Sequence, residues 1–171
     1  MNTPLVRSRR AFIKALAPIS LAHIARVVQP PQSAFSAREL ADYRLTDEVF
    51  RRFAHATRLI ASATRHDARF EQQPLLTKDI VVAGDAAEMA TALQSRLEGE
   101  PSVAVALFAA DISSHEYATF AISLFAARLA HGFVASGAMR RVPAGVASDN
   151  VTFVGRHERE IAVLLKQLRL E

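Results

Sequence analysis

Apolar residues recur at helical spacing from Thr46 to about His66. Thr46 can cap the free amides at a helix start, and Asp47 and Glu48 follow in the first turn, where negative charge is favourable. The apolar positions lie at alternating steps of four and three and so share one face. They are Val49, Phe53, Ala56, Ile60 and Ala63. The opposite face carries arginines that we expect in solvent, namely Arg51, Arg58 and Arg65.

Two shorter helices are predicted after residue 84. Asp85 and Glu88 have capping-box spacing, and Gly99 can adopt the left-handed conformation that stops a helix, so the pattern predicts a helix from Asp85 to Glu98. Its inner face is expected to hold Met89, Leu93 and Leu97. Pro101 is allowed in a first helical turn and starts a third helix. This helix carries the large apolar residues Val103, Leu107 and Phe108.

The longest apolar pattern predicts a central helix over about 114–136. Ser113 and Glu116 form a second capping box, and Gly137 stands at the end as a helix stop. Apolar residues occupy nearly all sides, so we expect the other helices to surround this one. One stripe holds Phe120, Leu124, Ala127, His131 and Val134, and another holds Ala118, Ile122, Phe125 and Leu129.

A last helix is predicted from Ser148 to about Arg169, after a connector over residues 139–145. Its stripe is Phe153, His157, Ile161, Leu164 and Leu168. Residues 67–84 have no helical period, and a lone short strand there would lack a partner, so no sheet is expected. The sequence therefore predicts an all-α fold: an irregular bundle of four or five helices around the central apolar helix, in one domain over residues 37–171.

The N-terminal segment has the order of an export signal. A basic start precedes a mostly apolar stretch over residues 15–28 and a polar, proline-containing end. The run Ser8-Arg9-Arg10-Ala11-Phe12-Ile13-Lys14 closely resembles the twin-arginine (Tat) translocation pattern Ser/Thr-Arg-Arg-x-Phe-Leu-Lys, with isoleucine in place of leucine. The residues that carry the resemblance are Arg9, Arg10, Phe12 and Lys14.

The resemblance implies a signal peptide over residues 1–36, recognition by the twin-arginine translocase, and a periplasmic or secreted bacterial protein. Small residues at Ala34 and Ser36 favour cleavage after Ser36. Two alternatives stay open for this segment, an amphipathic N-terminal helix of a cytosolic protein and a mitochondrial presequence.

Charge and cysteine content narrow the function classes. The net charge of +4 arises from 21 basic and 17 acidic residues, and five of the basic ones lie within residues 1–36, which hold no acid. The rest of the chain therefore has 16 basic against 17 acidic residues, which argues against a nucleic-acid partner. The absence of cysteine excludes disulfides, thiolate metal sites, c-type haem and a lipoprotein anchor.

Candidate chemistry is sparse. There is no phosphate-binding loop, nucleophile elbow or paired-histidine zinc motif. His131 and His157 both fall on apolar stripes, where two inward histidines could hold haem iron or a metal, with Met89 as a neighbour. The alternative is two hydrogen-bonded core histidines. The mature chain shows no stable membrane span, since Tyr117–Val134 contains Arg128 and His131.

We therefore expect an exported binding or structural domain. A haem- or metal-binding electron-transfer protein that uses His131 and His157 is the second hypothesis. An enzyme of unidentified type is the third, and no constellation in the sequence supports it.

Overall fold

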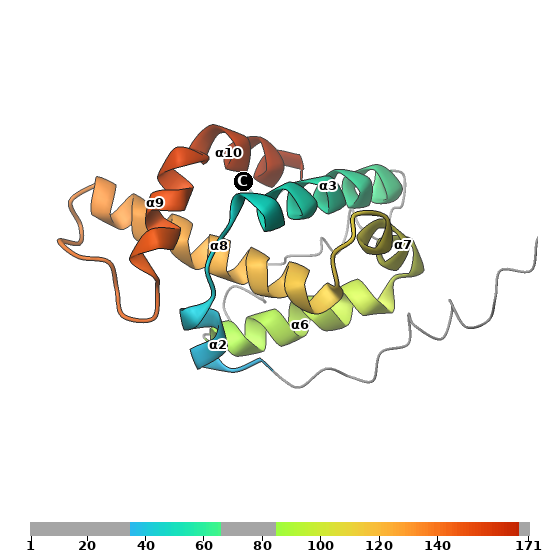
Figure 1. The fold of residues 1–171 in the computed structure, drawn as a ribbon, viewed down its shortest axis with the longest axis horizontal. Helices are drawn as coiled ribbons and strands as arrows, with labels where there is room; N and C mark the ends of the chain where they lie inside the picture. The colour runs from blue at the N-terminus through green and yellow to red at the C-terminus, as the bar shows by residue number, and fades with distance from the viewer. Residues whose placement is uncertain (1–34, 66–84, 168–171) are drawn as a thin grey trace, which may run out of the picture. The chain divides into compact units, whose positions relative to one another are not determined.

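The computed structural model describes residues 35–65 and 85–167 (Figure 1). These residues form seven helices and no strand, which confirms the all-α bundle. The helices are α2 (Ala37–Asp42), α3 (Asp47–Thr64), α6 (Ala86–Gly99), α7 (Pro101–Ala109), α8 (Ser114–Ala135), α9 (Ser148–Arg156) and α10 (Glu158–Gln167). The predicted loop over residues 67–84 lies outside the described residues, as does the proposed signal up to residue 34.

Local capping sets most helix starts where the sequence placed them. The Thr46 hydroxyl accepts from the Val49 amide at 3.3 Å, and the Asp85 carboxylate accepts from the Ala87 amide at 2.8 Å. The Ser113 hydroxyl accepts from the Glu116 amide at 3.0 Å. Each side chain satisfies an amide that has no carbonyl partner inside its own helix, and so fixes the first turn.

The core forms around the first half of α8. Every residue from Tyr117 to Leu124 is buried, and Phe120 is fully buried between two rings of α3. Its centroid lies 6.1 Å from that of Phe50 and 4.8 Å from that of Phe53. The central position predicted for α8 holds for this half of the helix.

The second half of α8 departs from the prediction. Leu129 and Phe133 expose 48% and 46% of their surface, and Val134 exposes 37%. Ser114 of α8 bonds Glu98, the penultimate residue of α6, at 2.7 Å, so the end of α6 lies beside the start of α8. α6 has 14 residues and α8 has 22, so α6 can cover at most about two-thirds of α8. α8 therefore extends beyond α6, and its last turns project from the described core.

The end of α6 differs from the prediction, and α7 exposes one of its large apolar side chains. Gly99 belongs to α6 and has no positive φ, because the chain turns into α7 through extended Glu100 and no left-handed residue is needed. Phe108 is 75% exposed. Val103, Ala106 and Leu107 form the buried face of α7, and Phe108 lies about 100° further around the axis.

The predicted last helix is broken in two. His157 ends α9 with φ −106° and ψ 16°, and α10 begins at the next residue. α9 packs against α8, whereas α10 packs against α3. Phe153 and Val154 are the buried apolar residues near the break in α9, and Ile161 and Leu164 are those of α10. The break at His157 therefore turns the chain from one neighbouring helix to the other.

The chain also contains a short helix that the sequence analysis missed. α2 starts at the Ser36 cap, whose hydroxyl accepts from the Glu39 amide at 3.1 Å. Phe35, immediately before it, is buried with its ring stacked on His115 at 4.3 Å between centroids. The packed unit therefore includes Phe35 and Ser36, ahead of the predicted domain start at residue 37.

Candidate functional site

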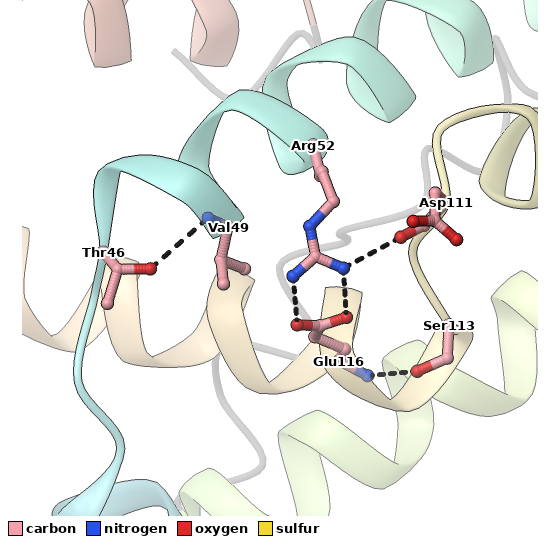
Figure 2. Close-up of polar contacts among 6 residues, drawn as sticks. All are labelled: Thr46, Val49, Arg52, Asp111, Ser113 and Glu116. Carbon is pink, nitrogen blue, oxygen red and sulfur yellow. Dashed lines mark hydrogen bonds and ion pairs between the residues drawn. The ribbon is translucent and has the colours of Figure 1, made fainter.

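The most elaborate polar contact joins α3 to the start of α8 (Figure 2). Arg52 donates from both terminal nitrogens to the Glu116 carboxylate, at 3.1 and 3.0 Å. The same guanidinium donates to the Asp111 carbonyl at 2.9 Å, in the turn between α7 and α8. Asp111 has φ 53°, a left-handed conformation that is uncommon outside glycine. Arg52 thus stabilises a strained turn and fixes the first turn of α8.

Tyr43 lies within the field of this ion pair. Burial, followed by the Glu116 carboxylate, raises the pKa of its phenol to about 12, and Arg52 partly opposes the rise. Its hydroxyl is buried and has no hydrogen-bond partner among the described residues. The phenol is therefore protonated at neutral pH and is a donor rather than a base.

His115 is the histidine nearest to this cluster in sequence. Its Nε2 lies 2.8 Å from Oε1 of Glu39, and its ring is stacked on Phe35. The contact ties α2 and the residue before it to α8. His115 therefore positions α2 against α8.

His157, the first of the two sequence-predicted site residues, has carboxylates near both ring nitrogens. Its Nε2 is 2.8 Å from Oδ1 of Asp47, and its Nδ1 is 3.4 Å from Oε1 of Glu160. The ring also packs on Phe50 and Phe153, with centroids 5.0 and 4.5 Å away. A metal or haem iron at either nitrogen would have to displace a carboxylate.

His131, the second, packs against the backbone of α9. A Cβ added at Gly155 would lie 3.3 Å from the His131 Nε2. Gly155 is two residues from both Phe153 and His157, about 200° around a helix axis, so His131 contacts the side of α9 opposite to Phe153. His157 packs on Phe153 itself. This arrangement does not favour a ligand shared by His131 and His157.

Other metal chemistry finds no support in the part of the chain that the structure describes. Residues 35–65 and 85–167 contain no group of three or more His, Cys, Asp or Glu that could hold a metal ion. Met89, the proposed neighbour of the histidines, is buried on α6 among core residues.

The exposed half of α8 presents a different kind of site. A hollow of about 340 Å³ lies along one face of the helix. It is lined by Phe125, Arg128, Leu129, Gly132, Phe133 and Ser136. These positions recur at steps of three and four, so they form one helical face that combines aromatic and aliphatic surface with a single cation.

By length and composition, α8 is also the one helix in the described ranges that could cross a membrane. Half of its apolar window is buried in the protein. The buried half surrounds Phe120, so the helix serves first as the centre of the core.

The sequence analysis missed Arg52 and Glu116 as a pair. Arg52 lies three residues after Val49 and four before Ala56, on the apolar face of α3. A charged residue on an apolar face is the sequence signal by which Arg52 could have been identified. The partner at residue 116 is 64 positions away and carries no local signal. No protein-family model, curated protein or solved structure matches the chain.

Proposed function

We propose that the protein is exported through the twin-arginine translocase and works outside the cytoplasm as a helical binding domain. The observation that carries the proposal is the run from Ser8 to Lys14, which fits the translocation pattern at every defined position except Ile13. The described, packed residues begin at Phe35, close to the end of the proposed signal over residues 1–36.

The fold is suited to this route, which carries folded proteins. The chain has no cysteine, so its packing does not depend on disulfides that form only after export. The helices close around aromatic residues of α3, α8 and α9. A domain of this kind can complete its fold in the reducing cytosol.

A binding role accounts for the surface better than catalysis does. The conspicuous polar groups of the described residues contact one another across helices, as Arg52 does with Glu116 and His157 with Asp47. These contacts hold elements together and converge on no cleft. The hollow on α8 is mostly apolar, with Arg128 and Ser136 as its polar side chains, and such a surface suits recognition of a ligand better than reaction with it.

Export is tested by replacing Arg9 and Arg10 together with lysine. The double variant should accumulate as precursor in the cytoplasm, because a guanidinium pair differs from two ammonium groups in geometry and hydrogen bonding. The matched control replaces Arg7 and Arg26 with lysine, which makes the same chemical change outside the pair and should leave export intact. Periplasmic protein at the original level from the Arg9/Arg10 variant would refute the assignment.

A further inference from the structure

The emergent end of α8 and the loop after it combine exposed apolar and cationic side chains. We call this surface the α8 tip. Its apolar members are Leu129, Phe133, Val134 and Met139, each at least 37% exposed. Its basic members are Arg128, Arg140 and Arg141, all exposed. In Figure 1 the end of α8 and the loop after it, in orange, lie at the left edge of the described residues.

The apolar side chains of the tip lie on more than one side of α8. Leu129 and Phe133 lie on the same side of α8, and Val134 lies about 100° further around the axis. Gly137 then turns the chain back with φ +75°, and the Met139 amide bonds the Phe133 carbonyl at 3.0 Å. Met139 is thereby held beside the last turn. A partner helix would cover one of these sides, whereas a lipid layer can contact both.

The charge of the tip has one sign. From Tyr117 to Ser148 the sequence holds three arginines and no acidic residue. Of the flanking acids, Glu116 is paired with Arg52 at the other end of α8, and Asp149 is in the first turn of α9. None of the three tip arginines forms an ion pair within the described ranges. Guanidinium groups of this kind match phosphate oxygens.

We propose that the α8 tip inserts into the surface of an anionic phospholipid bilayer. The four apolar side chains enter the boundary between headgroups and acyl chains, and Arg128, Arg140 and Arg141 contact lipid phosphates. The inference rests on the proposed binding function and names its partner. α8 is long and apolar enough to cross a membrane, but its residues from Tyr117 to Leu124 are buried in the core. The remaining residues are too few for a span, which needs about 20, so the protein lies on the membrane and does not cross it.

The test is flotation of the full chain with phosphatidylglycerol vesicles and, separately, with phosphatidylcholine vesicles. Binding should occur on phosphatidylglycerol and be much weaker on phosphatidylcholine. Arg140→Gln with Arg141→Gln should weaken binding about 30-fold, at roughly fivefold for each arginine near an anionic surface. Leu129→Ser with Phe133→Ser should weaken it on the order of tenfold, through the lost apolar contact.

The matched control is Val105→Ser with Phe108→Ser on α7. These side chains are 68% and 75% exposed, more than those of the tip, so the control removes as much exposed apolar surface elsewhere. It should bind as the unmodified chain does. Thermal melts show that each variant is folded. All variants keep the basic N-terminal segment, so vesicle binding due to that segment would survive the tip substitutions and overturn the proposal.

Two further results would overturn it. The first is equal binding to both lipids. The second is a tip-dependent dimer in sedimentation with no vesicle binding, which would assign the surface to a second copy of the chain. Export of the unmodified protein distinguishes the two proposals. A protein that is exported but does not bind vesicles fails the lipid inference alone, and one that binds vesicles but is not exported fails the export assignment alone.

Discussion

Arg52 shows how one side chain positions three segments of this fold. Its two-point contact with Glu116 orients α8 against α3, and its bond to the Asp111 carbonyl stabilises a turn with a positive φ (Figure 2). Both charged side chains are about 30% exposed, so solvent weakens the Coulomb attraction. Most of the stability that the Arg52–Glu116 contact contributes should therefore come from the geometry of its hydrogen bonds.

Replacing Arg52 with methionine should lower the free energy of unfolding by about 1–2 kcal/mol, because three charge-assisted bonds are lost while Glu116 keeps partial hydration. Urea denaturation measures the change. Arg58→Met is the control, since Arg58 is exposed on the same helix and should cost less than about 0.5 kcal/mol. Equal effects of the two substitutions would show that Arg52 contributes no specific contact.

The two tyrosines predict an alkaline transition. Burial raises the pKa of Tyr117 to about 12 although a hydrogen bond with Thr57 opposes the rise, and the pKa of Tyr43 reaches about 12 as well. Below the ordinary value of 10.0 both phenols are protonated in folded and unfolded chains and contribute nothing. Between 10.0 and about 12 only the unfolded chain loses these protons, so stability should fall as pH rises.

The decrease in the free energy of unfolding due to Tyr117 should approach about 2–3 kcal/mol near pH 12. The chain has two tyrosines and no tryptophan, so phenolate absorbance reports these groups without interference. Tyr117→Phe should show a shallower fall in stability. Glu116→Gln should move the pKa of Tyr43 down and Arg52→Met should move it up, because the two charges act on it in opposite directions. Titration of both phenols near 10 in the native protein would contradict their burial.

At the scale of the helices, the helix starts were predictable from neighbouring residues, whereas contacts between residues far apart in the sequence were not. The caps at Thr46, Asp85 and Ser113 were predictable because donor and acceptor lie two or three residues apart. Asn150 was missed, although its side chain bonds the Leu45 amide and the Tyr43 carbonyl, both at 2.9 Å. Those partners are more than 100 positions away in the sequence, and no local pattern identifies them.

The same limit explains the errors on exposure. Apolar periodicity shows that a residue is on an apolar face, but whether another helix covers that face depends on where the neighbour begins and ends. Phe120 and Phe133 belong to the same helix with similar surroundings in sequence, yet one is fully buried and the other nearly half exposed. α6 ends beside the start of α8 and is eight residues shorter, so it is too short to reach the turn that holds Phe133.

Phe120→Ala should therefore cost about 3–5 kcal/mol of unfolding free energy, since it empties a large site between Phe50 and Phe53. Phe108→Ala is the control on the neighbouring α7, where a 75% exposed ring has little contact to lose and should cost under about 0.5 kcal/mol. Denaturant melts of both variants give the comparison. A loss under 1 kcal/mol for Phe120→Ala would mean that the ring is not at the centre of the bundle.

For the whole molecule, the main question is where the folded domain starts. The sequence favours cleavage after Ser36, and the structure adds a physical cost to a cut at that bond. Phe35 is 6% exposed, and the Ser36 hydroxyl caps α2. Together these residues anchor α2 beside α8 through the stacked ring of His115. A cut after Ser36 would remove both the Phe35 ring and the Ser36 cap.

A protein that starts at Ala37 should consequently be less stable than one that starts at Ala34, by about 2–4 kcal/mol. The estimate combines about 1.5–3 kcal/mol for exposing the buried phenylalanine with about 1 kcal/mol for the lost helix cap. Urea melts of the two proteins measure the difference, and Ser36→Ala in the longer protein isolates the cap. The N-terminal residue of protein recovered from the periplasm then shows which form the cell makes. Equal stability of the two forms would mean that Phe35 and α2 add nothing to the domain, and cleavage after Ser36 would carry no structural cost.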